Sequence, residues 1–170
     1  MECSSYALLG DLCRWLGLNK FMPLQFLRKL KLKRKPSSVS LLKQCMTHGI
    51  PSVPGVYLLI AKHRRFQYPN GRSPVYYIGQ TKSLNKRIVK QHSVWHARVR
   101  SGKYVIEARH EYGGVYGGRY CYIQTWPGIS PEKLEKKVIR AFMQRYYAPP
   151  VANGAQVWGW VEKIHFRKSK

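Results

Sequence analysis

The chain has 170 residues, 31 of them lysine or arginine and 7 aspartate or glutamate, which gives a formal net charge of +24. This length suits one domain with an extension and is enough to bury a core without disulfides. Such a cationic excess predicts an anionic partner, with nucleic acid ahead of an anionic membrane surface. So few acids exclude catalysis by a large cluster of carboxylates.

The four cysteines are scattered and form no C-x-x-C pair, so we expect neither a zinc finger nor a zinc ribbon. No apolar run approaches the ~18 residues of a membrane-spanning helix. The early charges of Glu2, Asp11 and Arg14 are unlike those of a secretory signal. These features predict a soluble protein of the reducing cytoplasm, associated with the nucleoid if the source is bacterial, with no membrane partner.

Residues 1–50 are predicted to form a helical, basic N-terminal extension. Leucines recur at helical spacing in residues 6–16, and Pro23 is expected to open a second helix that runs through the basic stretch 28–35. A solvated helix face would explain this run, but the lack of balancing acids favours a clamp on phosphates. Residues 37–40 are interpreted as a connector to a third helix at 41–46. The expected phosphate contacts are Lys29, Lys31, Lys33, Arg34 and Lys35.

Residues 51–155 are predicted to form the main domain. Apolar runs bounded by proline or glycine indicate three strands, at 56–61, 75–79 and 120–126. A polar loop with an Asn70-Gly71 turn signal separates the first two strands. This order predicts an antiparallel hairpin.

Two helices are predicted in the same domain, one from Ser83 to about Arg100 and one from Ser130 to about Tyr147. The Gly- and Tyr-rich segment between them is expected to hold a strand near Val105 and a mobile loop at 113–118. The order of elements predicts an α+β fold with a small, central, three-stranded antiparallel sheet flanked by helices. Residues 156–170 are interpreted as an edge strand and a basic tail.

Five short elements occur in order along this domain. Pro54 precedes Gly55-Val56-Tyr57, Tyr77-Ile78-Gly79 ends the second strand, and Arg87 follows Tyr77 by ten residues. Glu135 opens the last helix with apolar residues three and four positions on, and Asn153 follows a pair of prolines. This arrangement resembles the GIY-YIG nuclease family. Each element alone is a weak signal, whereas the five together are a strong one.

The resemblance implies a GIY-YIG-like fold and metal-dependent hydrolysis of phosphodiester bonds. Arg87 would neutralise the phosphate in the transition state, since its fork matches two phosphate oxygens. Glu135 would hold Mg²⁺, or Mn²⁺, together with water and a substrate phosphate. Tyr57 or Tyr77 would activate water, although a phenol with a pKa near 10 is only ~0.1% ionised at pH 7 and needs positive surroundings. The predicted catalytic residues are Tyr57, Tyr77, Arg87, His92 and Glu135, with Gly79, Lys82 and Asn153 in support.

Two departures from the family pattern bear on proton transfer. The family often has His or Tyr four residues after the arginine, where this chain has Gln91 and places His92 one residue later, a rotation of about 100° on an α-helix. His92 reaches the site if the helix end is irregular; otherwise its role is lost or passes to another group. Gln80 stands where one branch of the family has lysine, and Lys82 is its expected substitute. Residues 62–74 look like an inserted loop. Further residues expected to contact DNA are Arg64, Arg65, Arg72, Lys86 and Lys90.

Some residues leave a choice of interpretation. His92 and His96 stand four apart, as zinc ligands on a helix do, but no third ligand is evident and two polar surface histidines are the favoured interpretation. Glu132 competes with Glu135 as the metal ligand, and Glu135 fits the family spacing better. Glu107 is expected to be solvated.

We therefore predict a metal-dependent DNA endonuclease that acts on duplex DNA. Restriction or phage defence is the favoured setting, with homing, mobile-element or repair roles as alternatives. The rival interpretation is a non-catalytic DNA-binding or architectural protein that keeps the fold, and RNA stays open as a substrate. Since one active site cuts one strand, double-strand cleavage would require a homodimer, a larger homo-oligomer or sequential nicking.

Overall fold

The structure is a computed structural model that describes residues 24–40, 49–103, 107–117 and 119–154. This part of the chain has an α+β fold, as predicted, built on an antiparallel sheet with the strand order β1-β6-β2-β5. The strands of this sheet are β1 (Ser37–Ser40), β2 (Gly55–Ile60), β5 (Val75–Thr81) and β6 (Arg119–Gln124).

The sheet has one strand more than the sequence predicts. β2, β5 and β6 match the three expected strands, whereas β1 comes from the segment 37–40 that was expected to be a connector. β1 pairs with β6, with Ser37 opposite Tyr122 and Ser40 opposite Arg119. Three of its four residues are serine, so it lacks the β-branched and aromatic residues that indicate a strand. Pairing with the edge of β6, a non-local interaction, makes it one.

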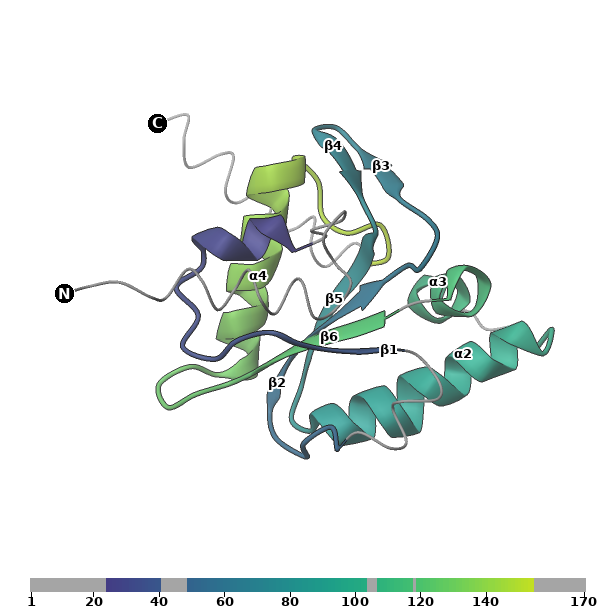
Figure 1. The fold of residues 1–170 in the computed structure, drawn as a ribbon, viewed down its shortest axis with the longest axis horizontal. Coiled ribbons are helices and arrows are strands. Elements are labelled where there is room, and N and C mark those ends of the chain that lie inside the picture. The colour runs from purple at the N-terminus through teal and green to yellow at the C-terminus, as the bar shows by residue number, and fades with distance from the viewer. Residues whose placement is uncertain (1–23, 41–48, 104–106, 118, 155–170) are drawn as a thin grey trace.

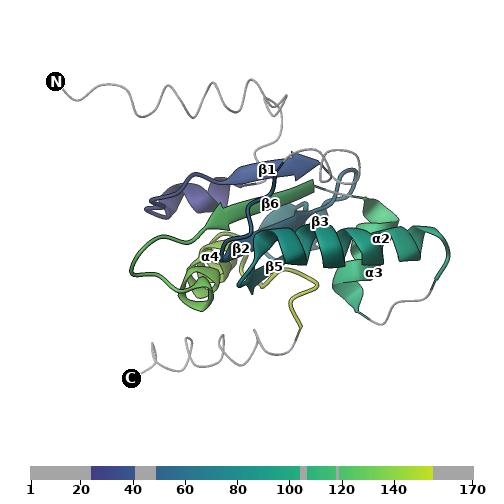
Figure 2. The same cartoon turned by 90° about the horizontal axis from the view of Figure 1, so that it is seen from below.

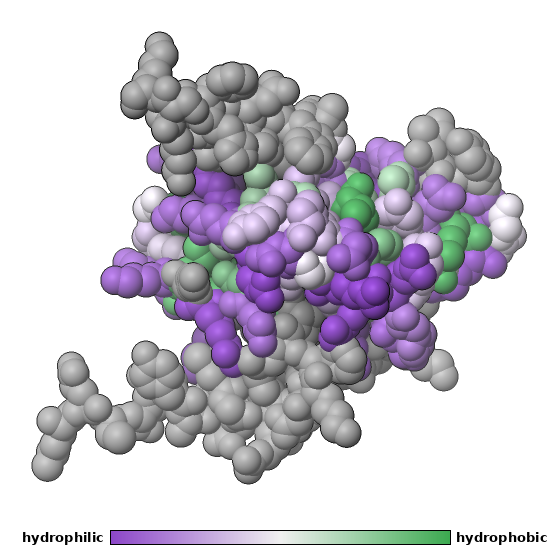
Figure 3. Space-filling view, turned by 90° about the horizontal axis from the view of Figure 1, so that it is seen from above, coloured by the Kyte–Doolittle hydropathy of each residue, from purple (hydrophilic) through white to green (hydrophobic). Residues whose placement is uncertain are grey.

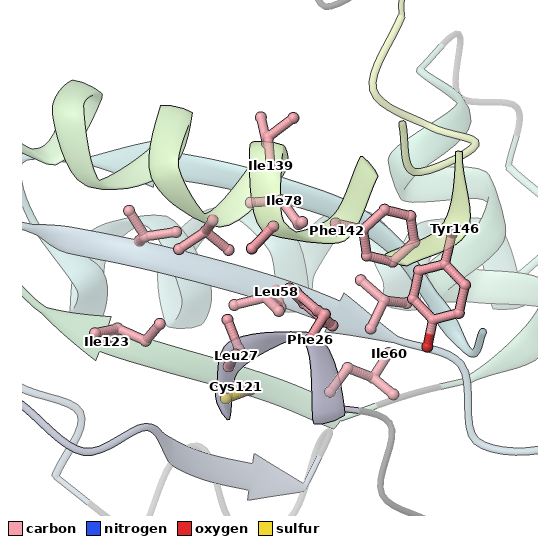
Figure 4. Packing of buried hydrophobic residues seen from close by; sticks show 14 of the residues in the cluster. Phe26, Leu27, Leu58, Ile60, Ile78, Cys121, Ile123, Ile139, Phe142 and Tyr146 are labelled. Carbon is pink, nitrogen blue, oxygen red and sulfur yellow. The ribbon is translucent and has the colours of Figure 1, made fainter. Parts of the chain in front are cut away.

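Helix α4 (Pro131–Tyr146) covers one face of the sheet (Figures 1 and 2). Leu58 and Ile78 of the strands pack there with Ile139 and Phe142 of the helix (Figure 4). The predicted start of this helix is confirmed, because the Ser130 hydroxyl accepts a hydrogen bond from the Lys133 backbone N–H at 3.2 Å. Such a cap satisfies a backbone donor that the first helical turn leaves free.

The opposite face is covered by η2 (Lys86–His92), α2 (Ser93–Arg100) and α3 (Ala108–Tyr116). Side chains alternate along a strand, so Tyr57 and Leu59 point to this face while Leu58 points to α4. The sheet therefore separates two hydrophobic clusters, one against α4 and a tyrosine-rich one on the α2 side.

Residues 113–116 of the expected mobile loop are helical instead, because they belong to α3, where Gly113 and Gly114 are buried. An added Cβ at Gly114 would lie 2.3 Å from the Val99 side chain, and one at Gly113 would lie 2.1 Å from the His96 ring. The two glycines thus let α3 approach α2 closely. Read locally, a glycine pair indicates a loop; here it permits close packing of two helices.

The predicted insertion at 62–74 holds a docked hairpin of β3 (Phe66–Tyr68) and β4 (Gly71–Ser73). The Asn70-Gly71 turn is confirmed, with Gly71 at φ 102°. The Asn70 side-chain amide donates to the carbonyl of Arg145 at 2.9 Å, which attaches the turn to the end of α4.

The predicted long second helix is wrong in extent. A short 3₁₀ helix, η1 (Gln25–Lys29), is followed by extended backbone at Leu30. Leu30 and Leu32 pack against the core, whereas Lys31 and Lys33 are exposed. This alternation suits an extended chain rather than a helix, because every second side chain faces the core.

Other predicted features lie outside the described residues, namely the helices at 6–16 and 41–46, the strand near Val105 and the segment 156–170. Within the described ranges, no helix combines the length and apolar character needed to cross a membrane. Hydrophilic side chains dominate the described surface in the view of Figure 3.

Candidate functional site

Two tyrosines from paired strands lie together on the α2 side of the sheet. Tyr57 of β2 stands opposite Gly79 of β5, and Tyr77 precedes that glycine by two residues. The two ring centroids are 5.9 Å apart. A Cβ atom at Gly79 would lie 2.6 Å from the Tyr77 ring and 2.7 Å from the Tyr57 hydroxyl. Gly79 therefore supports the pair by leaving room for both rings.

The helix after Ser83 brings Arg87 and His92 to these tyrosines through an irregular turn. Lys86–His92 forms a π-helix, in which the Ser93 N–H donates to the carbonyl of Ile88 five residues back. A π-turn holds one residue more than an α-turn, so His92 lies about one turn after Arg87 despite the five-residue spacing.

His92 consequently lies against Tyr57 and is fully buried, with the two ring centroids 5.0 Å apart. Arg87 is partly exposed and is near enough to Tyr57 to act on its pKa. The irregular helix that His92 needs in order to approach the tyrosines is therefore present. The role of His92 in proton transfer stays a prediction.

A second arginine, Arg109 of α3, lies over Tyr77. Its guanidinium carbon is 5.4 Å from the ring centroid, and Nη1 donates a hydrogen bond to the Tyr77 hydroxyl at 3.3 Å. The Tyr57 hydroxyl also interacts with Tyr77, which raises the pKa of Tyr57. The Tyr77 hydroxyl therefore accepts a hydrogen bond from a cationic donor.

The two tyrosines differ in their environment. Burial, the proximity of Tyr77 and the hydrogen bond to it raise the pKa of Tyr57 well above its ordinary value, and the attraction of Arg87 does not offset them. Tyr57 is 2% exposed, whereas Tyr77 is partly exposed. Tyr57 is thus suited to donate a hydrogen bond, and Tyr77 can meet a water molecule.

Glu135 reaches the same strand from the other side. It lies near the start of α4, and its carboxylate accepts a hydrogen bond from the backbone of Gln80, the residue after Gly79. Burial, and to a lesser extent the nearby Glu132 carboxylate, raise the pKa of Glu135 to about 7, against the lowering effects of that hydrogen bond and of Lys136. β5 is an edge strand, at the end of the strand order. Glu135 approaches it from the α4 face of the sheet, and the tyrosines lie on the α2 face.

Asn153 closes the outer edge of β5. Its Nδ2 donates to the Ile78 carbonyl at 2.6 Å, and its Oδ1 accepts from the Ile78 N–H at 2.8 Å. The Ala152 N–H donates to the Tyr76 carbonyl at 2.8 Å. Asn153 thereby satisfies backbone groups that an edge strand would leave free, in the strand that carries Tyr77 and Gly79.

Three histidines lie behind the tyrosine pair. His92, His96 and His110 are buried, and one ring nitrogen from each lies within 4.8 Å of the others. The favoured interpretation of His92 and His96 as surface residues is wrong, because both are fully buried against α3 and the sheet. Burial lowers the pKa of each ring, that of His96 to about 3, so all three are neutral at neutral pH.

The remaining predicted DNA contacts that the structure describes are exposed. Arg72 Nε donates to the Gln67 amide oxygen at 2.8 Å, and the Arg64 guanidinium carbon is 5.9 Å from the Tyr116 ring centroid. The side chain of Lys29 lies outside the described part of the chain. The exposed DNA contacts are Lys31, Lys33, Arg34, Lys35, Arg64, Arg65, Arg72, Lys86 and Lys90. Lys82, predicted to support the catalytic residues, is exposed as well.

Sequence reasoning missed Arg109 and His110, which α3 brings to the site. Glu107 is exposed, as expected. Its carboxylate also forms an ion pair with Arg109 and accepts a hydrogen bond from His110 Nε2 at 2.9 Å. The one local signal was the glycine pair at 113–114, which was interpreted as a loop. If that segment is interpreted as a helix, Arg109 and His110 lie on the same helix, about one turn before the glycines that contact α2.

Comparison with known proteins yields no match to a family model, a curated protein or a solved structure. The order of the motifs and the geometry of the site are therefore the grounds for a functional proposal.

Proposed function

We propose that the protein is a metal-dependent endonuclease that hydrolyses phosphodiester bonds of DNA at a centre similar to that of GIY-YIG nucleases. The observation that carries the proposal is the tyrosine pair over Gly79 with Arg87 and Arg109 beside it. Both arginines are partly exposed, so a phosphate can approach them. The net charge of +24 supports nucleic acid as the substrate.

Tyr77 acts as the general base in this proposal. The hydrogen bond from Arg109 would stabilise negative charge on its oxygen when it takes a proton, whereas burial keeps Tyr57 neutral. Tyr77 takes the proton of the attacking water, and the two arginines neutralise the charge that develops on the phosphate. His92 packs against Tyr57 and holds it in place.

Glu135 is the residue that would hold Mg²⁺, or Mn²⁺. It fits this role because a half-buried carboxyl with a raised pKa is stabilised by a nearby cation. A single carboxylate is sufficient when waters and a substrate phosphate complete the coordination. When bound, the ion supplies charge neutralisation at the phosphate and at the leaving oxygen.

One observation favours the rival, a non-catalytic DNA-binding protein that keeps the fold. Glu135 meets β5 from the α4 side, whereas Tyr57 and Tyr77 lie on the α2 side. If this separation persists when the protein binds DNA, the carboxylate and the tyrosines do not act on one phosphate.

Restriction or phage defence is the favoured setting of the nuclease, and DNA is favoured over RNA.

The test is incubation of the purified full chain with supercoiled plasmid, and with RNA, in Mg²⁺ or in EDTA. Nicked or linear plasmid should form in the presence of Mg²⁺ and not in EDTA. Tyr77→Phe and Glu135→Ala should each slow single-turnover cleavage by ~10²-fold or more, while Glu132→Ala, a change at an exposed acid of the same helix, stays active.

Gel shifts in EDTA should show that all three variants still bind DNA. A folded wild-type protein that binds but does not cut in Mg²⁺ or Mn²⁺ would establish the rival. A folded Glu135→Ala protein that cuts at the wild-type rate would remove Glu135 from the metal site.

A further inference from the structure

The buried histidine cluster (His92, His96 and His110) carries an inference that is independent of the nuclease proposal. Its ring centroids are 5.0 Å apart for His92 and His110, 5.8 Å for His92 and His96, and 5.9 Å for His96 and His110. The exposed fractions are 0%, 0% and 6% for His92, His96 and His110. Three neutral imidazoles from three helical elements thus converge at one point inside the protein.

The ring nitrogens divide into two groups. The outer ones have partners: His96 Nδ1 lies 3.1 Å from the Tyr120 hydroxyl, and His110 Nε2 lies 2.9 Å from the Glu107 carboxylate. The inner ones, His96 Nε2 and His110 Nδ1, have no hydrogen-bond partner among the described residues. The two ring nitrogens of His92 also lack a partner there. The Arg109 carbonyl is close enough to affect the pKa of His96, yet Nε2 makes no hydrogen bond.

In His96 and His110 this division is the one that a metal ligand requires. A histidine ligand binds the ion through one nitrogen and is held through the other by a carboxylate, a carbonyl or another polar group. Buried polar atoms without partners are costly, at about 1–3 kcal/mol each. One nitrogen of each ring lies within 4.8 Å of the others, so a single ligand can reach all three rings. A water molecule would satisfy some of them, whereas one cation can accept lone pairs from all three rings.

We propose that His92, His96 and His110 bind one transition-metal ion of the Zn²⁺ class, which ties η2 and α2 to α3 behind the tyrosine pair. Neutral imidazole suits Zn²⁺ and Co²⁺, and not Mg²⁺. Nitrogens bound to zinc at ~2.0–2.1 Å lie roughly 3.3 Å apart in a tetrahedral site. Binding therefore draws the three nitrogens together by up to ~1.5 Å, which small ring rotations can supply.

The surroundings of the cluster are built for this arrangement. An added Cβ at Gly113 would lie 2.1 Å from His96 Nε2, so glycine permits the approach of α3 that brings His110 in. Tyr120 stacks on His96 with an interplanar angle of 7°, and Trp95 stacks on His110 at 28°. The ion would hold the helices that position Arg87, Arg109 and Tyr57.

The experiment uses the full chain after chelation and gel filtration, reloaded with Zn²⁺, Co²⁺ or Mg²⁺. We expect one Zn²⁺ per chain by elemental analysis, tetrahedral d–d bands with Co²⁺, and a melting temperature raised by about 5–10 °C at a Zn²⁺ concentration near 100 times Kd. Mg²⁺ should give none of these effects. In ¹⁵N-edited spectra of the histidine rings, Zn²⁺ should shift the signals of His96 Nε2 and His110 Nδ1.

Variants separate this site from other zinc-binding residues. In a Cys3, Cys13 and Cys45→Ser background, His96→Gln should lose the stoichiometric zinc, and His63→Gln, at an exposed histidine, should keep it. Glu135→Ala should also keep zinc, so failure of the nuclease proposal leaves this one standing. Wild-type protein that takes up no zinc, zinc without histidine shifts, or zinc retained by folded His96→Gln would each overturn the proposal.

Discussion

Gly79 lies directly beneath both tyrosines, and the absence of its side chain creates the space that they occupy. An added methyl group would lie within 3 Å of both rings, closer than real carbon contacts allow. The same strand position is paired across the sheet with Tyr57, so the two motif tyrosines and the glycine form one packing unit. The steric fit of the two tyrosine rings over Gly79 therefore explains why glycine follows Tyr77 at a spacing of two residues.

Gly79→Ala should therefore destabilise the protein by about 1–3 kcal/mol, the usual cost of overpacking, because the rings of Tyr57 and Tyr77 must move. Urea unfolding of the two proteins measures this difference. Gly154→Ala is the matched control, since nothing lies within 4 Å of its added Cβ. Equal effects of the two substitutions would contradict the packing of the tyrosines over Gly79.

Glu135 predicts a pH dependence of stability. Its pKa rises from an ordinary 4.5 to about 7 in the folded protein, so the folded state holds the proton more tightly than the unfolded state. The resulting stabilisation is complete below about pH 4.5 and is lost as the pH rises through about 7. In EDTA, Glu135→Gln should remove this loss and be more stable than wild type at pH 8, by on the order of 1 kcal/mol after allowance for partial exposure.

The measurement is urea unfolding of wild type and variant in EDTA at pH 5 and pH 8. Glu111→Gln, a change at an exposed acid of α3, should not alter the difference between the two pH values. If wild type and Glu135→Gln lose the same stability between pH 5 and pH 8, Glu135 does not titrate in this range.

At the scale of elements, the π-helix decides which residues face the tyrosines. It accommodates one residue more than an α-helix between Arg87 and the end of η2, and so brings His92 rather than Gln91 against Tyr57. π-Turns are rare and are often found at functional sites. The five-residue spacing between Arg87 and His92 is thus compensated by backbone geometry.

Deletion of Gln91 tests this compensation. It should let the segment relax to an α-helix with His92 four residues after Arg87, so the fold should survive with equal or higher melting temperature. Deletion of Val94, an exposed residue of α2, is the control and should lower the melting temperature strongly, because it rotates His96 and Val99 by about 100° away from α3. A Gln91 deletion as damaging as the Val94 deletion would refute the compensation.

At the scale of the whole molecule, charge is the dominant property. The basic stretch after η1 is held by Leu30 and Leu32 against the core and presents Lys31 and Lys33 to solvent. An anchored row of cations suits contact with phosphates, which do not report base sequence. We therefore expect this stretch to contribute binding without specificity.

Changing Lys29, Lys31, Lys33, Arg34 and Lys35 to alanine should flatten the plot of log K against log salt concentration by about 0.9 for each phosphate of duplex DNA that the variant no longer neutralises. Affinity for two unrelated duplexes over a salt series measures the slope. The control changes five other exposed basic residues, Lys103, Arg119, Lys133, Lys137 and Arg140, which separates local phosphate binding from net charge. A slope that changes equally in both variants would remove the basic stretch from the interface.

The sequence by itself determined the features that depend on neighbouring residues. The strands β2, β5 and β6, the Asn70-Gly71 turn and the capped start of α4 follow from alternation, turn chemistry and a Ser-Pro pair. The proximity of Tyr57, Gly79 and Tyr77 could also be predicted from the sequence, because the register of a hairpin brings them together.

Tertiary structure alone decided the features that depend on residues far apart in the chain. Serine-rich β1 is a strand because β6 offers an edge, and the glycines of α3 belong to a helix because α2 packs on them. Arg109 and His110 meet Tyr77 and His92 through that helix contact. Local propensity carries no signal for such pairings, since their stability arises only when both partners are already in place.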